Sequence, residues 1–469
     1  MPSRLLQRKP LERFFAEANG RAEGHALKRV LGPLDLMLLG IGGIIGTGIF
    51  VLTGVAAVDH AGPAVVASFA VAALACGLAG LCYAEFATLI PISGRAYSYA
   101  YATLGEIVAW VIGWDLILEY AVAASAVASG WSGYFRVILE SMGIALPVAI
   151  SHAPGTAEGA LVNLPALLVI LAVSTLLVIG IRESARANAV IVALKLGVIL
   201  FVIIAGFPHV KPANWHPFAP FGWHGIMSGG AIVFFAYIGF DCVTTAAEET
   251  RNPERDMPIG ILGSLVVCTL LYLAVSAIVT GMVPLAQIDR TAPLATAFRD
   301  NGLSFAAGLI SIGAIVGLTS VLLVLLLGQS RIFLAMSRDG LMPKAFGRIH
   351  PRFRTPHIST ILVGLIVAVL SGLTPLAVLV ELVSIGTLFA FVLVSAGVLV
   401  LRRLQPDLRR PFRCPWVPAV PLLAIAACGY LMASLPGVTW LRFVVWLVIG
   451  LVLYASYGRR HSRLASSNP

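Results

Sequence analysis

Two glycine-rich segments interrupt hydrophobic stretches that are otherwise long enough to cross a lipid bilayer. The first covers residues 40–50 (GIGGIIGTGIF) and the second residues 229–241 (GGAIVFFAYIGFD). Glycine is a poor helix former, and in lipid every backbone N–H and C=O group needs a hydrogen-bonding partner. Opening a helix at bilayer depth is therefore tolerable only where the freed backbone groups line a cavity or meet a ligand. Two such interruptions, at corresponding positions of two halves, indicate a small-molecule carrier with its site near the bilayer midplane.

The composition is that of a polytopic membrane protein. Of the 469 residues, 59% are hydrophobic and only 12% are charged, whereas roughly a quarter of the residues of a soluble domain are charged. The net charge of +10 does not indicate nucleic acid as a partner, because the basic residues fall in short loops without interleaved aromatic side chains that stack on bases. The six cysteines form no Cys-x-x-Cys pair, and the nine histidines fall in loops, tails or span ends. We therefore expect no metal, no cofactor and no catalytic residues.

Twelve hydrophobic segments approach the roughly 20 apolar residues that a bilayer-spanning helix requires. The predicted spans are 33–57, 62–90, 105–129, 163–181, 187–207, 225–248, 258–284, 303–334, 357–373, 376–401, 417–435 and 438–457. Five spans fall within residues 33–207 and five within 225–401, and an odd number per repeat inserts the second half upside down. Residues 402–457 hold two accessory spans, and residues 1–32 and 458–469 are tails.

The basic residues predict the orientation of the chain. All but six of the 32 lysines and arginines fall in the two tails and in the loops on the same side as the tails. The six exceptions are Arg136, Lys211, Arg290, Arg299 and Arg442 on the other side and Lys195 within a span. Because cytoplasmic loops carry the excess of Lys and Arg, both termini are predicted to be cytoplasmic.

The two interruptions predict the chemistry of a substrate site. An opened helix end around Gly43–Gly48 presents N–H groups and a partial positive charge, which together bind a carboxylate. The carbonyl groups around Phe235–Ile238 can accept hydrogen bonds from an ammonium group, so the pair suits an amino-acid zwitterion. The alternative is that the glycines only permit close helix packing. The residues predicted to form the substrate site are Ile41, Gly42, Gly43, Ile44, Gly46, Thr47, Gly48, Phe235, Ala236, Ile238, Glu119, Asp241, Tyr272 and Val324.

Ionisable residues within the spans are costly and mark function. Lys195 lies halfway along its span. Burial disfavours the charged form of a lysine whereas nearby carboxylates or carbonyls favour it, so Lys195 is predicted to take up and release the coupling proton. The alternative is a lysine that extends to the interface. Glu119 and Asp241 are candidates to pair with Lys195, to line the pocket or to hold a cationic substrate side chain, whereas Asp115 is expected to be an interfacial carboxylate bonded to a helix end.

Other polar and aromatic residues in the spans give weaker signals. Thr319 and Ser320 are candidate hydroxyls for the pocket or for an ion site, although hydroxyls in membrane helices usually bond to their own backbone. Phe235 is predicted to close over the substrate as a gate because it lies at the second interruption. The span around Val324 carries no acid that would hold a cationic side chain.

Several segments together resemble the amino acid/polyamine/organocation superfamily, and within it the cationic amino acid transporter family and its bacterial permease relatives. These segments are 40–50, 91–97 (PISGRAY), 235–241, 248–258 and 337–340 (SRDG). The resemblance implies the LeuT-type fold, a substrate bound between the first and sixth spans, and alternating access. It also implies that Lys195 occupies the place of the sodium ion of sodium-coupled relatives.

The sequence therefore predicts a proton-coupled symporter of L-amino acids in the cell membrane, with small neutral substrates such as alanine. Its predicted partners are the amino acid, the proton and the lipid bilayer, and the sequence gives no indication of a small membrane subunit. One alternative is a proton-independent exchanger or uniporter of arginine, lysine or ornithine, in which Glu119 or Asp241 meets the side-chain charge. A membrane-embedded enzyme would need a nucleophile–base pair or a histidine cluster, and the sequence contains neither at the predicted pocket.

Overall fold

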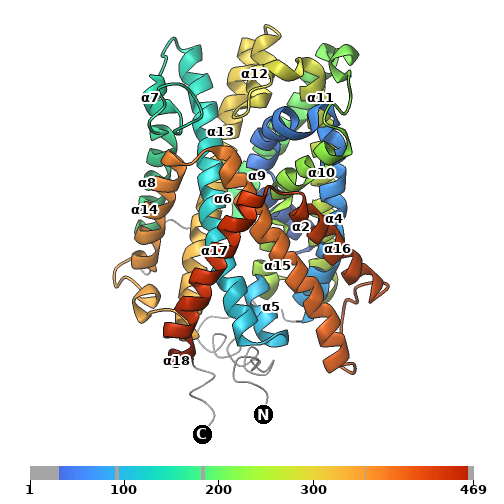
Figure 1. Cartoon of the computed structure of the whole chain (residues 1–469), viewed down its shortest axis with the longest axis vertical. Coiled ribbons are helices and arrows are strands. Elements are labelled where there is room, and N and C mark those ends of the chain that lie inside the picture. The colour runs from blue at the N-terminus through green and yellow to red at the C-terminus, as the bar shows by residue number, and fades with distance from the viewer. Residues whose placement is uncertain (1–30, 90–94, 181–184, 354, 463–469) are drawn as a thin grey trace.

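The described residues form an all-helical protein. The computed structural model describes residues 31–89, 95–180, 185–353 and 355–462, and within these ranges the only β-structure is two isolated bridges. The helices run roughly along one direction, with α5 (Arg95–Thr103) and α18 (Arg459–His461) at one end and α7 (Val148–Ser151) and α12 (Pro293–Asp300) at the other (Figure 1).

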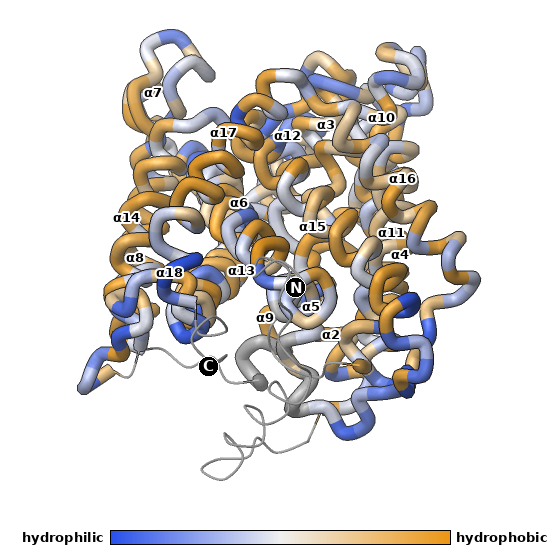
Figure 2. Tube along the Cα trace, turned by 60° about the horizontal axis from the view of Figure 1, so that its bottom comes forward, coloured by the Kyte–Doolittle hydropathy of each residue, from blue (hydrophilic) through white to orange (hydrophobic). Residues whose placement is uncertain are grey.

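Hydrophobic helices long enough to span a membrane dominate the fold. Seven helical stretches of the described residues are long and apolar enough to cross, namely Gly48–Leu89, Glu106–Ser141, Ala189–His209, Pro253–Met282, Ser304–Arg338, Leu376–Leu404 and Gly437–His461. Four shorter apolar helices accompany them, namely Pro33–Ile44, Leu164–Ile179, His357–Leu373 and Ala419–Ala433. Figure 2 shows hydrophobic residues along the helices and hydrophilic residues gathered mainly in the connecting segments. The predicted class, an all-helical polytopic membrane protein, is confirmed.

The predicted segments coincide with helices of the structure. In chain order the helices are α2 (Pro33–Ile44), α4 (Val65–Leu89), α6 (Glu106–Ser141), α8 (Leu164–Ile179), α9 (Ala185–Gly206), α10 (Gly222–Val233), α11 (Pro253–Met282), α13 (Ser304–Arg338), α14 (His357–Leu373), α15 (Leu376–Leu404), α16 (Ala419–Ala433) and α17 (Gly437–Leu453). The third predicted span, 105–129, coincides with the first part of α6, which continues to Ser141. Its small polar residues past residue 129 are buried against other helices, and Ser132 donates a hydrogen bond of 2.6 Å to Asn163 at the start of α8.

Both glycine-rich segments interrupt their helices, as predicted. α2 ends at Ile44, Ile45 has an extended backbone (φ −72°, ψ 101°), and helical turns resume over residues 48–61. α10 ends at Val233, a short 3₁₀ turn covers Phe234–Tyr237, and Ile238 is extended before a second 3₁₀ segment, Phe240–Glu249. Gly239 between these segments has φ +118°, a conformation that favours glycine.

A buried ion cluster ties α4 to α15 and to the loop that follows α15. The carboxylate of Glu85, only 2% exposed, accepts hydrogen bonds from Arg402 at 2.7 Å and from the backbone N–H of Cys414 at 2.8 Å. The guanidinium of Arg410 lies 3.3 Å from the same carboxylate. Because the charges are buried together, removing one partner leaves the others without compensation.

We expect Glu85→Gln to lower the free energy of unfolding by about 3 kcal/mol, measured as a lower melting temperature in detergent. The control is Glu254→Gln, because the Glu254–Arg409 pair is exposed and its atoms are 3.8 Å apart. Exposed ion pairs contribute little to the free energy of unfolding. The control variant should therefore have the melting temperature of the wild type. Equal melting temperatures for both variants and the wild type would contradict a stabilising role for the cluster.

Candidate functional site

A cavity lies where the two interrupted helices face each other. It encloses about 540 Å³ including the part that opens to solvent, a volume within the range of small-molecule sites. Helices α6 and α13 complete its wall. The lining residues are Gly42, Gly43, Ile44, Gly46, Thr47, Gly48, Tyr120, Val127, Phe235, Ile238, Gly239, Asp241, Val321, Val324 and Leu325.

Glycines allow the two interruptions to touch through their backbones. A Cβ atom placed on Gly239 would lie 2.5 Å from the carbonyl carbon and oxygen of Gly43, and one on Gly48 would lie 2.4 Å from the Cα of Ala236. Real Cβ atoms do not approach that closely, so both positions require glycine. The glycines therefore permit close packing, which was the alternative interpretation of the sequence, and the same packing encloses the cavity.

The first interruption offers backbone N–H groups to the cavity. The helical turns that resume at Gly48 leave the first amides of a helix without intrahelical acceptors, and this end carries the positive side of the helix dipole. Gly46, Thr47 and Gly48 line the cavity. The hydroxyl of Thr47 is 2% exposed and has no hydrogen-bond partner within the described part of the chain. The arrangement suits an anionic group such as a carboxylate.

Two side chains bind carbonyl groups that the interruptions leave free. The Nζ of Lys195 donates to the carbonyl of Gly42 at 3.0 Å. The hydroxyl of Tyr272 lies 2.8 Å from the carbonyl oxygen of Ile44 and 2.9 Å from that of Ala236. Tyr272 is fully buried and joins one interruption to the other, and it is not among the residues that line the cavity.

Lys195 is enclosed between α2 and α13. Lys195 is only 1% exposed to solvent. Its methylene groups pack against Gly317, where an added Cβ atom would lie 3.2 Å from the lysine Cγ. The side chain therefore does not extend to the interface, which was the alternative for this residue. It ends on the carbonyl of Gly42, a residue of the cavity wall.

The other predicted site residues divide into two groups. Those that line the cavity are Gly42, Gly43, Ile44, Gly46, Thr47, Gly48, Phe235, Ile238, Asp241 and Val324, and those outside the lining set are Ile41, Ala236, Glu119, Tyr272, Thr319 and Ser320. Thr319 donates to the carbonyl of Ile315 at 2.7 Å and accepts from the indole of Trp131. Ser320 donates to the carbonyl of Gly317 at 3.1 Å. The hydroxyls of Thr319 and Ser320 therefore bond to their own helix, as hydroxyls in membrane helices usually do.

The sequence reasoning missed Tyr120 and Val127. Both lie on α6 and line the cavity. They are seven residues apart, two helical turns, so they share one face of the helix. Helical periodicity from Glu119 leads to Val122, Ala123 and Ala126 instead, so no signal in the sequence marked this face.

The expectation for Asp115 is wrong. Asp115 is 0% exposed, and neither of its carboxylate oxygens has a hydrogen-bond partner among the described residues. It was expected at the interface because Glu119 was taken as the carboxylate nearer the middle of the span. Helix α15 packs on Asp115 through Gly386, so Asp115 is enclosed instead.

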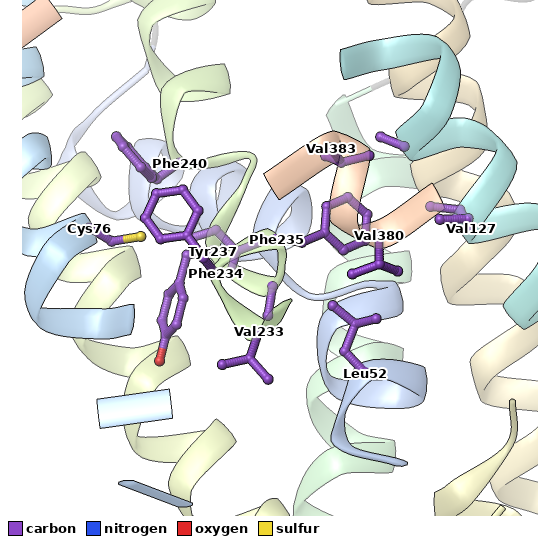
Figure 3. Close-up of a cluster of buried hydrophobic side chains, with 14 of the residues drawn as sticks. Leu52, Cys76, Val127, Val233, Phe234, Phe235, Tyr237, Phe240, Val380 and Val383 are labelled. Carbon is purple, nitrogen blue, oxygen red and sulfur yellow. The ribbon is translucent and has the colours of Figure 1, made fainter. Parts of the chain in front are cut away.

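Apolar side chains surround the cavity away from the backbone polar groups. Figure 3 shows Phe235 beside Val127, Val380 and Val383, separate from the cluster around Phe234, Tyr237 and Phe240. Phe235 is 6% exposed and also lines the cavity. The one ionisable carboxylate of the lining set is Asp241, which is 8% exposed. No group of three His, Cys, Asp or Glu residues in the described ranges could hold a metal ion.

The fold and cavity define a class of protein. A polytopic helical protein whose interrupted helices enclose a small cavity with free backbone groups is a membrane transporter rather than an enzyme. The chain belongs to the amino acid permease family of the amino acid/polyamine/organocation superfamily, whose sequence profile matches residues 31–455. The predicted family resemblance is thereby confirmed.

Curated relatives cover nearly the whole chain. The branched-chain amino acid permease BcaP of Bacillus subtilis is 52% identical over 99% of this chain and 100% of its own length. The methylthioribose transporter of the same organism is 49% identical over 98% of this chain and 99% of its own length. The vacuolar cationic amino acid transporter 4 of Arabidopsis thaliana is 33% identical over 94% of this chain and 93% of its own length.

Proposed function

We propose that the protein is a proton-coupled symporter that carries neutral L-amino acids across the cell membrane. In this proposal the backbone amides around Gly43–Gly48 bind the substrate carboxylate, and carbonyl groups around Phe235–Ile238 bind its ammonium group. Lys195 exchanges the coupling proton. The observation that carries the proposal is the pair of interrupted helices that meet through Gly43 and Gly239 and together line one cavity.

The proposed membrane arrangement is twelve spans with both termini in the cytoplasm. The first ten spans form two inverted repeats of five, as in the LeuT-type fold, and the last two are accessory. The excess of Lys and Arg on the side of the tails supports this orientation. The equivalent placement of the two interruptions, in the first and sixth predicted segments, supports the repeat.

The proposed substrates are small and neutral, such as alanine. The cavity wall opposite the interruptions consists of Val321, Val324 and Leu325 on α13 and Val127 on α6, so a substrate side chain meets hydrocarbon. The name of the Bacillus subtilis relative adds branched-chain amino acids as a second candidate class, and the same apolar wall suits them.

A proton-independent exchanger of cationic amino acids remains the competing function. It is supported by the carboxylate of Asp241 in the lining set and by the plant relative named a cationic amino acid transporter. It differs from the first proposal in the charge moved in each cycle and in the substrates that compete.

The test is uptake of labelled L-alanine into proteoliposomes with and without an inward proton gradient, in competition with excess L-arginine or L-leucine. Proton-coupled transport of neutral amino acids would be supported if the gradient stimulates alanine uptake and if leucine, but not arginine, inhibits it. Gradient-stimulated uptake of labelled leucine, with no uptake of labelled alanine, would restrict the substrates to the branched-chain class. Uptake that is insensitive to the gradient, or strong inhibition by arginine, would favour the cationic exchanger.

We expect Tyr272→Phe to raise the KM for alanine roughly tenfold. The change removes the hydroxyl that holds the carbonyls of Ile44 and Ala236 and leaves them buried without that donor, at a cost of about 1–2 kcal/mol. The measurement is the concentration dependence of alanine uptake. Tyr430→Phe is the matched control because Tyr430 is 53% exposed. An unchanged KM in Tyr272→Phe would show that this bridge does not position the substrate site.

A further inference from the structure

Asp115 is a buried carboxyl group that the proposed coupling through Lys195 does not use. It lies on α6, is 0% exposed, and has two carboxylate oxygens without a hydrogen-bond donor in the described ranges. None of the ion pairs between described residues includes it. This isolation distinguishes it from Glu85, which is equally buried and is bonded to arginines and to a backbone amide.

Helix α15 faces the carboxyl group through a glycine. A Cβ atom placed on Gly386 would lie only 2.7 Å from Oδ1 of Asp115, so the carboxyl group occupies the space that a side chain at 386 would fill. No backbone donor or positive charge from α15 reaches the carboxyl oxygens, since both lack a partner.

The charged and titratable groups of the helices packed on α6 do not compensate Asp115. On α15 and α17, Glu381 is bonded to Thr439 and lies 3.9 Å from Arg442. Also on α15, Arg402 is bonded to Glu85. On α5, the hydroxyl of Tyr97 donates to Asp339 at 2.7 Å. On α13, Arg331 is exposed, and on α14 His357 makes no hydrogen bond to Asp115, because Asp115 has none.

An ionised carboxylate in this position would lose its hydration without gaining a donor or a counter-charge. Desolvation of an isolated charge costs far more than desolvation of the neutral acid. The carboxyl group is therefore protonated in this conformation. To ionise, it must meet water or a donor, which requires α6 and α15 to separate at Gly386 or water to enter from the cavity.

Helix α6 reaches the substrate cavity at Tyr120, five residues after Asp115. Tyr120 on α6 lines the cavity, and its ring packs against Gly328 of α13, where a Cβ atom would lie 3.0 Å from Tyr120 Cε1. The adjacent Gln329 donates from Nε2 to the carbonyl of Ile117 at 3.0 Å, while its Oε1 is buried without a partner in the described ranges. A second unpartnered buried acceptor thus lies where α13 packs on α6.

We propose that Asp115 is a second proton-binding site of the carrier, which holds a proton in this conformation and exchanges it with the cavity during transport. The ligand is the proton itself. This inference rests on the proposed proton-coupled function. It adds a site on α6 to the one at Lys195 on α9.

The test measures proton and alanine entry together in proteoliposomes that contain a pH-sensitive dye, with the membrane potential held at zero. The proteins compared are the wild type, Asp115→Asn and the control Asp407→Asn, whose carboxylate is exposed in the loop after α15. We expect the number of protons per alanine to fall about twofold in Asp115→Asn and to stay at the wild-type value in Asp407→Asn. A wild-type ratio in Asp115→Asn overturns the proposal.

A second measurement on the wild type decides the question if Asp115→Asn is inactive. Infrared difference spectra, with and without alanine, are recorded on protein in which the aspartate carboxyl carbons carry ¹³C. A change in the C=O band of a protonated aspartic acid is expected when alanine binds, and its absence overturns the proposal. Failure of the proposed function gives a different result, because the wild type would then move alanine without any protons.

Discussion

Alanine uptake is expected to fall at least 100-fold when Gly239 is replaced with alanine, although the protein should still insert and fold. Gly239 has φ +118°, where a residue with a side chain is strained by about 1–3 kcal/mol. The new Cβ would also lie 2.5 Å from the backbone of Gly43 and 3.0 Å from the N–H nitrogen of Ile44. Because those atoms are backbone, relief requires the two interruptions to separate, and the cavity between them changes shape.

The measurement is initial uptake of labelled alanine, normalised to the amount of monodisperse protein in the vesicles. Gly77→Ala is the matched control, since Gly77 lies within α4 and a Cβ there meets no atom within 4 Å. Alanine favours a helix over glycine by about 1 kcal/mol, so this variant should transport normally and melt at or above the wild-type temperature. Normal transport by Gly239→Ala would mean that close contact between the interruptions is not needed for the site.

The features predicted correctly from the sequence are those that local pattern determines. Apolar length predicts the helical segments, and glycine content in an apolar segment predicts where a helix opens, as at Gly43 and Gly239. The all-helical membrane class followed from these patterns, whereas the family was predicted from the resemblance of several segments to known permeases. Contacts between side chains on different helices could not be predicted in this way, because they depend on how helices that are distant in the sequence are placed in the fold.

Tyr272 and Asp115 illustrate that limit. The hydroxyl of Tyr272 bonds to Ile44, 228 residues earlier in the chain, and no local pattern indicates that pairing. Asp115 was expected at the interface, but its environment is set by α15, which packs on it through Gly386, and no local pattern indicates that contact.

Loss of proton coupling is expected when Lys195 is replaced with methionine. The Nζ of Lys195 donates to the carbonyl of Gly42, which lies in the last turn of α2 and lines the cavity. A charged donor contributes about 1.5–3 kcal/mol to such a bond, and a neutral amine contributes less. Protonation of Lys195 therefore changes how firmly α2 is held at the interruption, which couples the proton to the conformation of the site.

Methionine keeps a flexible apolar side chain against Gly317 but cannot donate a hydrogen bond or take up a proton. Without the proton-dependent bond to Gly42, proton exchange at Asp115 has no conformational step to drive. Uptake by Lys195→Met should therefore be the same with and without an inward proton gradient, while alanine exchange between the two sides of the membrane continues. Lys211→Met is the control, because Lys211 is exposed in the segment after α9, and its uptake should respond to the gradient like that of the wild type. If the gradient still drives uptake by Lys195→Met, the coupling proton binds elsewhere, and Asp115 would be the remaining buried candidate on α6 that lacks a partner in the described ranges.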